Sequence, residues 1–152
     1  MRNYVIRKIS DAKNLAKLYT KKNSEDLPKR RFYFSLEKRC NNFMKGSRHN
    51  KTVILLGLRG AGKTTAFLQL YKYLTEEKGI DEDRVLYVSL DEVVELHGAS
   101  LYDVAMTYIT EILGEIPESL EEHTFLLVDE AHFDEKWQTA VKFSTIELRT
   151  CS

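Results

Sequence analysis

The chain has 152 residues, of which 43% are apolar, and its 23 Lys and Arg balance its 23 Asp and Glu. This length is enough for one domain that buries roughly 70% of the surface of the unfolded chain. No stretch approaches the roughly 20 apolar residues of a membrane span, and the N-terminus has no apolar signal segment. Composition therefore excludes a membrane-spanning protein and predicts a soluble, cytoplasmic one. Cys40 and Cys151 fit no metal or redox spacing and are expected to be reduced thiols.

The charges are unevenly distributed along the chain. Residues 1–63 hold 17 Lys and Arg against 4 Asp and Glu, whereas residues 64–152 hold 6 against 19. Such asymmetry predicts either a basic segment that packs on an acidic surface or a basic arm for nucleic acid or a membrane surface. Most of the charges are expected to be solvated in either case.

Residues 1–47 are predicted to form a basic N-terminal helical segment. Ser10 or Asp11 is expected to cap a first helix, whose apolar face carries Ala12, Leu15, Ala16 and Tyr19. A second helix is expected beyond Leu27-Pro28, and its candidate buried positions are Phe34, Cys40 and Phe43. The segment either covers one side of the core or binds single-stranded nucleic acid through its interleaved basic and aromatic residues.

The residues from Gly57 to Thr65 read GLRGAGKTT and follow the apolar run 53–56. This is the Walker A pattern G-x-x-x-x-G-K-[ST], in the strand-to-helix context that it requires. Glycines in the turn tolerate positive φ, so successive N–H groups can surround an anion at the start of a helix. Lys63 adds a charge for the β- and γ-phosphates, and the Thr64 hydroxyl suits Mg²⁺. The residues predicted to bind the nucleotide are Gly57, Arg59, Gly60, Ala61, Gly62, Lys63, Thr64 and Thr65. For Arg59, a neighbouring subunit and solvent are equally good alternatives.

The remaining elements alternate between helix and strand. A helix with Ala66, Phe67, Leu70 and Leu74 at helical spacing is expected to end near Gly79. Residues 85–90 form a β-rich run, Ser100 is expected to cap the next helix, and residues 125–128 form the third strand. The last strand has no polar alternation, as expected when both of its faces are covered. This order predicts an α/β fold with a parallel sheet.

The third strand runs directly into Asp129-Glu130, which is a Walker B pattern. Ligands of open parallel sheets bind at the carboxyl ends of the strands, where Thr64 and Asp129 would both project. Asp129 is predicted to hold Mg²⁺ or its waters. Glu130 and Lys63 are the residues predicted to be catalytic. Glu130 would orient and deprotonate the attacking water, and Lys63 would neutralise the charge that develops on the phosphates.

The two motifs, with Trp137 following, resemble those of the prokaryotic AAA-type ATPases over roughly residues 48–145. The marks of the resemblance are arginine at the third position of the loop, Leu90-Asp91 after the second strand, and the Walker B sequence ending in Asp129-Glu130. It implies a three-layer P-loop NTPase with a mostly parallel sheet, whose core is residues 48–152. It also implies MgATP binding and hydrolysis to ADP and phosphate, with Glu130 as the base.

The chain departs from that family after Walker B. In the family, a strand after Walker B lies between the two motif strands and carries a sensor residue, and an arginine finger and a helical lid follow. Only 22 residues follow Glu130 here, and residues 143–148 would supply one strand at most. We therefore expect a truncated module with an incomplete sheet, which leaves open a nucleotide-binding module without turnover.

A second alternative is a DEAH-like helicase fragment, because Asp129 to His132 spells that motif. The arginine-bearing strand-end motif of such helicases is absent, and Ser89-Leu90-Asp91 stands there instead. Self-association, and a protein or nucleic-acid partner at residues 1–47, are left open.

Overall fold

A computed structural model describes residues 1–47, 60–120 and 122–141. Its α-helices are α1 (Arg2–Thr20), α2 (Arg31–Met44), α3 (Lys63–Lys72), α4 (Leu90–His97) and α5 (Leu101–Met106). Its strands are β1 (Lys21–Lys22), β2 (Glu25–Asp26), β3 (Val85–Ser89) and β4 (Phe125–Asp129). Helix α3 continues into the π-helical turn η2 (Tyr73–Glu77), and α5 continues into η4 (Thr107–Ile112). The 3₁₀ turns are η3 (Glu82–Arg84), η5 (Pro117–Ser119) and η6 (Ala131–Phe133).

Strands β3 and β4 pair in parallel, with Val85 opposite Phe125 and Ser89 opposite Asp129. The molecule is therefore a mixed α/β protein with a small parallel sheet, and the predicted parallel arrangement is confirmed for these two strands. The strands expected at residues 53–56 and 143–148 lie outside the described residues.

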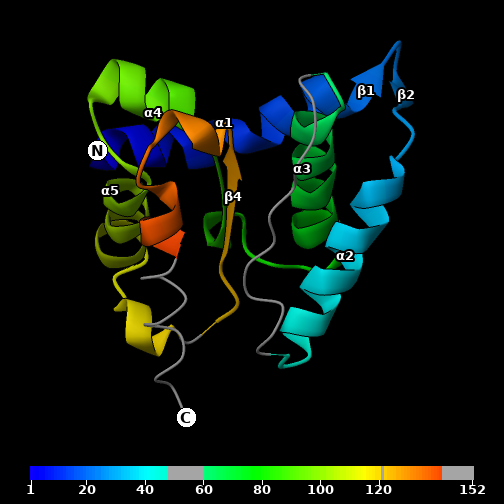
Figure 1. The fold of residues 1–152 in the computed structure, drawn as a ribbon. Coiled ribbons are helices and arrows are strands. Elements are labelled where there is room, and N and C mark those ends of the chain that lie inside the picture. Colours follow the sequence, from blue (N-terminus) through cyan, green and yellow to red (C-terminus); the bar gives the residue numbers. More distant parts are fainter. Residues whose placement is uncertain (48–59, 121, 142–152) are drawn as a thin grey trace.

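Apolar side chains cover both faces of this sheet. Alternate residues of a strand point to opposite faces, and the buried residues separate accordingly into two clusters. Val85, Tyr87, Phe125 and Leu127 pack with α2 and α3, whereas Leu86 and Val88 pack with α4 and α5. Figure 1 shows α2 and α3 on one side of β4 and α4 and α5 on the other. Burial on both sides explains why neither strand alternates between apolar and polar residues.

Helix α1 contributes to both clusters. Tyr4 and Val5 belong to the cluster around α4 and α5, and Ala12 and Ala16 belong to the cluster around α3. The expected helix start at Ser10 or Asp11 is wrong, because α1 begins at Arg2 and the Ser10 hydroxyl donates to the Ile6 carbonyl at 3.0 Å. The apolar residues before Ser10 extend the buried stripe, and burial of that stripe overrides the local capping signal.

One of the three candidate buried positions of α2 is wrong. Phe34 is 56% exposed, which corrects its assignment as a buried position, whereas Tyr33 and Leu36 are buried. Cys40 and Phe43 are partly buried against the same cluster, as expected. Tyr33, Leu36 and Cys40 recur at helical spacing, so Phe34 turns away from the face that they share.

Two of the predicted helix ends are confirmed by the structure. Gly79 follows η2 with φ +69°, as expected of a left-handed stop. The Ser100 hydroxyl accepts a hydrogen bond from the N–H of Asp103 in a capping box at the start of α5.

Helix α4 was not predicted. The second strand ends at Ser89, and Leu90 begins α4, which stops at Gly98 (φ +57°). Burial of Leu90 and Val93 accounts for this helix, because both side chains belong to the apolar cluster that contains Leu86 and Val88 of β3.

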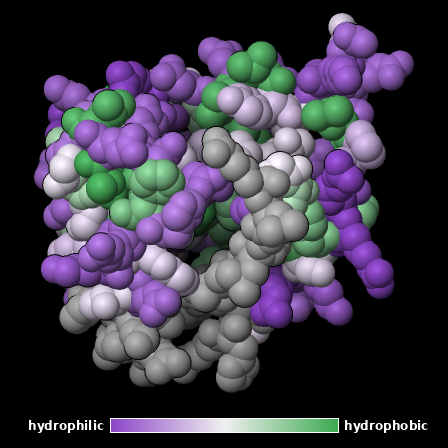
Figure 2. All heavy atoms as spheres, turned by 45° about the horizontal axis from the view of Figure 1, so that its top comes forward, coloured by the Kyte–Doolittle hydropathy of each residue, from purple (hydrophilic) through white to green (hydrophobic). Residues whose placement is uncertain are grey.

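The surface is mostly polar. Figure 2 shows charged and polar residues over most of the face seen there, with apolar residues in separate patches. Within the described ranges, no helix has the length and the apolar character that crossing a bilayer would need.

Candidate functional site

The described part of the glycine turn has the predicted backbone geometry. Gly60 has φ +82° and Gly62 has φ +87°, values that residues with a Cβ rarely adopt. Gly62 is the N-cap of α3, and Lys63 and Thr64 are the first residues of that helix. Gly57 and Arg59, which were also predicted to bind the nucleotide, lie outside the described residues. Of the remaining predicted residues, Ala61 and Thr65 are partly buried within this turn and the first turn of α3.

The turn faces the N-terminal segment. A Cβ added to Gly62 would lie 3.8 Å from both Cγ and Nε of Arg30. The loop that carries Arg30 is attached to α3, because the Gln69 side-chain amide donates to the Leu27 carbonyl at 2.9 Å. A guanidinium therefore lies next to the glycine turn. Sequence reasoning missed this residue, because no motif or spacing links Arg30 to the turn.

The two predicted motifs meet through a hydrogen bond. The Thr64 hydroxyl donates to Oδ2 of Asp129 at 2.5 Å. Thr64 lies in the first turn of α3, and Asp129 is the last residue of β4. The fold thus brings together two residues 65 positions apart, at the carboxyl end of the parallel sheet, as the sequence predicted.

Asp129 accepts two further hydrogen bonds. The Tyr87 hydroxyl donates to Oδ2 at 3.1 Å, and the main-chain N–H of Glu130 donates to Oδ1 at 2.9 Å. Asp129 is only 4% exposed, and a buried carboxylate is tolerated when it is hydrogen-bonded in this way. Burial, followed by the charge of Asp129, raises the pKa of Tyr87 far above its ordinary value, so this hydroxyl keeps its proton and remains a donor. Sequence reasoning missed Tyr87, since one tyrosine within an apolar strand carries no signal of a role at a site.

Glu130 holds an unusual backbone conformation next to Asp129. Its φ of +50° and ψ of +39° are left-handed, which is strained for a residue with a side chain. Its carboxylate is partly exposed and lies 3.4 Å from Nδ1 of His132. Glu130 therefore combines a strained position, contact with solvent and proximity to the Thr64–Asp129 pair.

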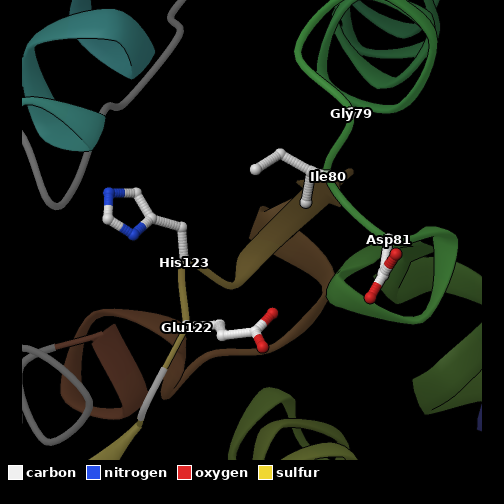
Figure 3. Close-up of a pocket in the computed structure, with 5 residues that line it drawn as sticks. All are labelled: Gly79, Ile80, Asp81, Glu122 and His123. Carbon is white, nitrogen blue, oxygen red and sulfur yellow. The ribbon is translucent and has the colours of Figure 1, made fainter.

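The pocket in Figure 3 lies elsewhere. It has a volume of about 320 Å³, and Figure 3 shows Glu122 and His123, before β4, facing Ile80 and Asp81, before β3. It is therefore at the amino end of the sheet, opposite Thr64 and Asp129. In the described part of the chain, no group of three or more His, Cys, Asp or Glu side chains is arranged to hold a metal. The carboxyl end is where parallel sheets bind ligands, so Thr64 and Asp129 form the better candidate.

The fold and this site define an α/β protein in which a glycine turn and helix N-terminus lie against an acidic strand end. A model of the AAA domain family matches residues 49–149, and the chain belongs to this family. It is therefore an AAA-type nucleotide-binding module, and the predicted membership of the AAA class is confirmed.

The chain is also similar in sequence to one protein of unknown function. An uncharacterized protein of Methanocaldococcus jannaschii is 31% identical over 143 residues. The alignment covers 93% of this chain and 28% of that protein, so the chain spans little more than a quarter of its relative's length. No solved structure matches the chain significantly. None of these matches supports the helicase alternative.

Proposed function

We propose that this protein is a MgATP-binding ATPase module of the AAA type, with a three-layer P-loop fold. The observation that carries the proposal is the hydrogen bond between Thr64 and Asp129, which joins the helix after the glycine turn to the acidic end of β4. In this proposal residues 48–152 form the nucleotide-binding core. Residues 1–47 form a basic segment packed on that core.

The residues at the site fit a bound Mg²⁺ and a triphosphate. The Thr64 hydroxyl has one proton and two lone pairs, so it can donate to Asp129 and still offer a lone pair to a cation. Mg²⁺ prefers oxygen donors, which both residues supply. The main-chain N–H groups from Gly60 onward and the Lys63 ammonium bind the phosphates. When bound, Mg²⁺ neutralises charge on the β- and γ-phosphates.

Glu130 is the proposed general base. Its carboxylate is accessible to water and follows Asp129 directly, so it can orient a water molecule and accept its proton as the β–γ bond breaks. Lys63 stabilises the charge that develops on the phosphates. The alternative is a nucleotide-binding module that uses the same binding residues without turnover. Self-association, and a protein or nucleic-acid partner at residues 1–47, stay predictions.

The test measures MgATP binding by calorimetry and phosphate release under steady state. Lys63→Ala is expected to weaken MgATP binding about 10- to 100-fold, because it removes a charged phosphate ligand. Glu130→Gln is expected to bind MgATP as the wild type does and to lose turnover by about 100-fold or more. Glu135→Gln is the matched control, because Glu135 is exposed on the same C-terminal segment.

Each outcome separates the two functions. Turnover that disappears in Glu130→Gln with binding retained supports the ATPase. Binding without phosphate release in the wild type supports the nucleotide-binding module. Absence of any heat when MgATP is added to folded wild-type protein would contradict both.

A further inference from the structure

We propose that Tyr87 is a positioning residue for Asp129, so that strand β3 contributes to the affinity of the site for Mg²⁺. This inference rests on the proposed function and deepens it, because it assigns a role to a residue outside both Walker motifs. Its basis is the hydrogen bond from the Tyr87 hydroxyl to Oδ2 of Asp129, at 3.1 Å.

Tyr87 is held in place by packing. It is 7% exposed, and its ring belongs to the apolar cluster that contains Ala16 of α1, Ala66 of α3 and Leu127 of β4. The ring therefore has little freedom to turn, and the hydroxyl is presented to Asp129 from a rigid strand. A donor fixed in this way orients the carboxylate more strongly than one on a mobile side chain.

The hydrogen bonds leave Asp129 a limited capacity for a cation. A carboxylate has about four lone-pair directions. Three of them are occupied, by Thr64 and Tyr87 on Oδ2 and by the N–H of Glu130 on Oδ1. The remaining direction, on Oδ1, would be the one open to Mg²⁺ or to a water bound to it.

Loss of the Tyr87 hydroxyl would relax this restriction. Oδ2 would keep only the Thr64 donor, and a second lone-pair direction would open beside the one on Oδ1, so Asp129 would no longer offer a cation a single direction. In the proposed site the phosphates are bound by main-chain N–H groups and Lys63 rather than by Asp129, so nucleotide binding without metal would be unaffected. The expected effect is specific to Mg²⁺, whereas a merely structural tyrosine would affect stability alone.

The experiment compares Tyr87→Phe with the wild type by titrating Mg²⁺ into protein with a fluorescent ATP analogue. The Mg²⁺ concentration at half-maximal binding is expected to rise on the order of 10-fold in Tyr87→Phe, as for loss of other residues that orient metal ligands. Nucleotide binding in excess EDTA is expected to stay unchanged. Tyr71→Phe is the matched control, because Tyr71 is also buried and its hydroxyl has no hydrogen-bond partner within the described part of the chain.

The outcomes distinguish this inference from the proposed function. Equal Mg²⁺ dependence in Tyr87→Phe and the wild type, or an equal loss of binding with and without Mg²⁺, would overturn the inference and leave the proposed function standing. No nucleotide binding by the wild type would overturn both. Phenylalanine fills the same space, and Tyr87→Leu provides a second variant without the hydroxyl if Tyr87→Phe does not fold.

Discussion

Asp129 and Glu130 are consecutive residues whose surroundings prepare them for different roles. Asp129 is buried and accepts three hydrogen bonds, so its orientation is fixed. Glu130 is partly exposed and has a left-handed backbone. This conformation turns the chain after β4, and the Glu130 N–H donates to Oδ1 of Asp129.

The left-handed backbone at Glu130 predicts that glycine is more stabilising than alanine at this position, the reverse of their usual order within a helix. Glu130→Gly is expected to have a higher free energy of unfolding than Glu130→Ala, by about 1 kcal/mol, because only glycine adopts positive φ without a steric cost. Chemical denaturation of the two variants measures this difference.

Glu95 supplies the control, because it is exposed within α4. There the order should reverse, with Glu95→Gly less stable than Glu95→Ala by about 1 kcal/mol, as in any helix interior. The same order at both positions would contradict the strained conformation of Glu130.

At the level of single elements, the start of α5 is the best-defined helix end. The Ser100 side chain and the Asp103 side chain each bond the other's main-chain N–H. Side-chain and main-chain hydrogen bonds from Ser100 lower the pKa of Asp103 below its ordinary value. This capping box fixes where α5 begins, immediately after the short connection from α4.

Ser100→Ala is expected to lower the free energy of unfolding by about 1 kcal/mol at pH 7. Because the pKa of Asp103 is lowered in the folded state, its contribution is present at neutral pH and is lost as the pH falls below about 4 and through the folded-state pKa. The difference between the wild type and Ser100→Ala should therefore narrow in acid. Urea denaturation at several pH values measures it.

Ser10→Ala is the matched control. Ser10 lies within α1, and its hydroxyl bonds the Ile6 carbonyl of the preceding turn rather than a free N–H. Its replacement is expected to change stability by less than about 0.5 kcal/mol and to show no dependence on pH. A loss at Ser10 equal to the loss at Ser100 would contradict the assignment of the cap.

For the whole molecule, α1 connects the two apolar clusters on opposite faces of the sheet. The N-terminal segment is thus part of the packed structure, with its basic residues on the outside. Ion pairs add to this packing, since Lys8 pairs with Glu92 of α4 and Lys13 pairs with Glu82 of η3 at 2.7 Å. The second pair is solvent-exposed and adds little stability. Some of the basic residues of the N-terminal half therefore pair with acidic residues that follow the glycine turn, as one of the two predicted explanations of the charge asymmetry requires.

Because α1 packs on both apolar clusters, we expect it to unfold together with the sheet in a single transition. Val5→Ala is expected to lower the free energy of unfolding by about 2 kcal/mol while unfolding remains a single transition, because Val5 is fully buried among residues of β3 and α4. Leu18→Ala, on the same helix, is expected to change it by less than about 0.5 kcal/mol, because Leu18 is 72% exposed. Two separate transitions in Val5→Ala would contradict a common folding unit.

The sequence alone determined the features that depend on neighbouring residues. Alternation of apolar runs with glycine, serine and acidic stops predicted β3, β4, α3 and the capped start of α5, since local steric and hydrogen-bonding preferences act over a few residues. The position of both Walker patterns at the carboxyl ends of predicted parallel strands likewise predicted that Thr64 and Asp129 would lie together. Predictions for Gly57 and Arg59 lie outside the described residues.

Only the tertiary structure decided the rest. The early start of α1, the exposure of Phe34 and the existence of α4 depend on which side chains the sheet buries, and burial is set by contacts between distant segments. The placement of Tyr87 on Asp129 and of Arg30 beside Gly62 depends on the same packing. A hydrogen bond between residues 42 positions apart has no local sequence signal, because its geometry exists only once β3 and β4 have paired.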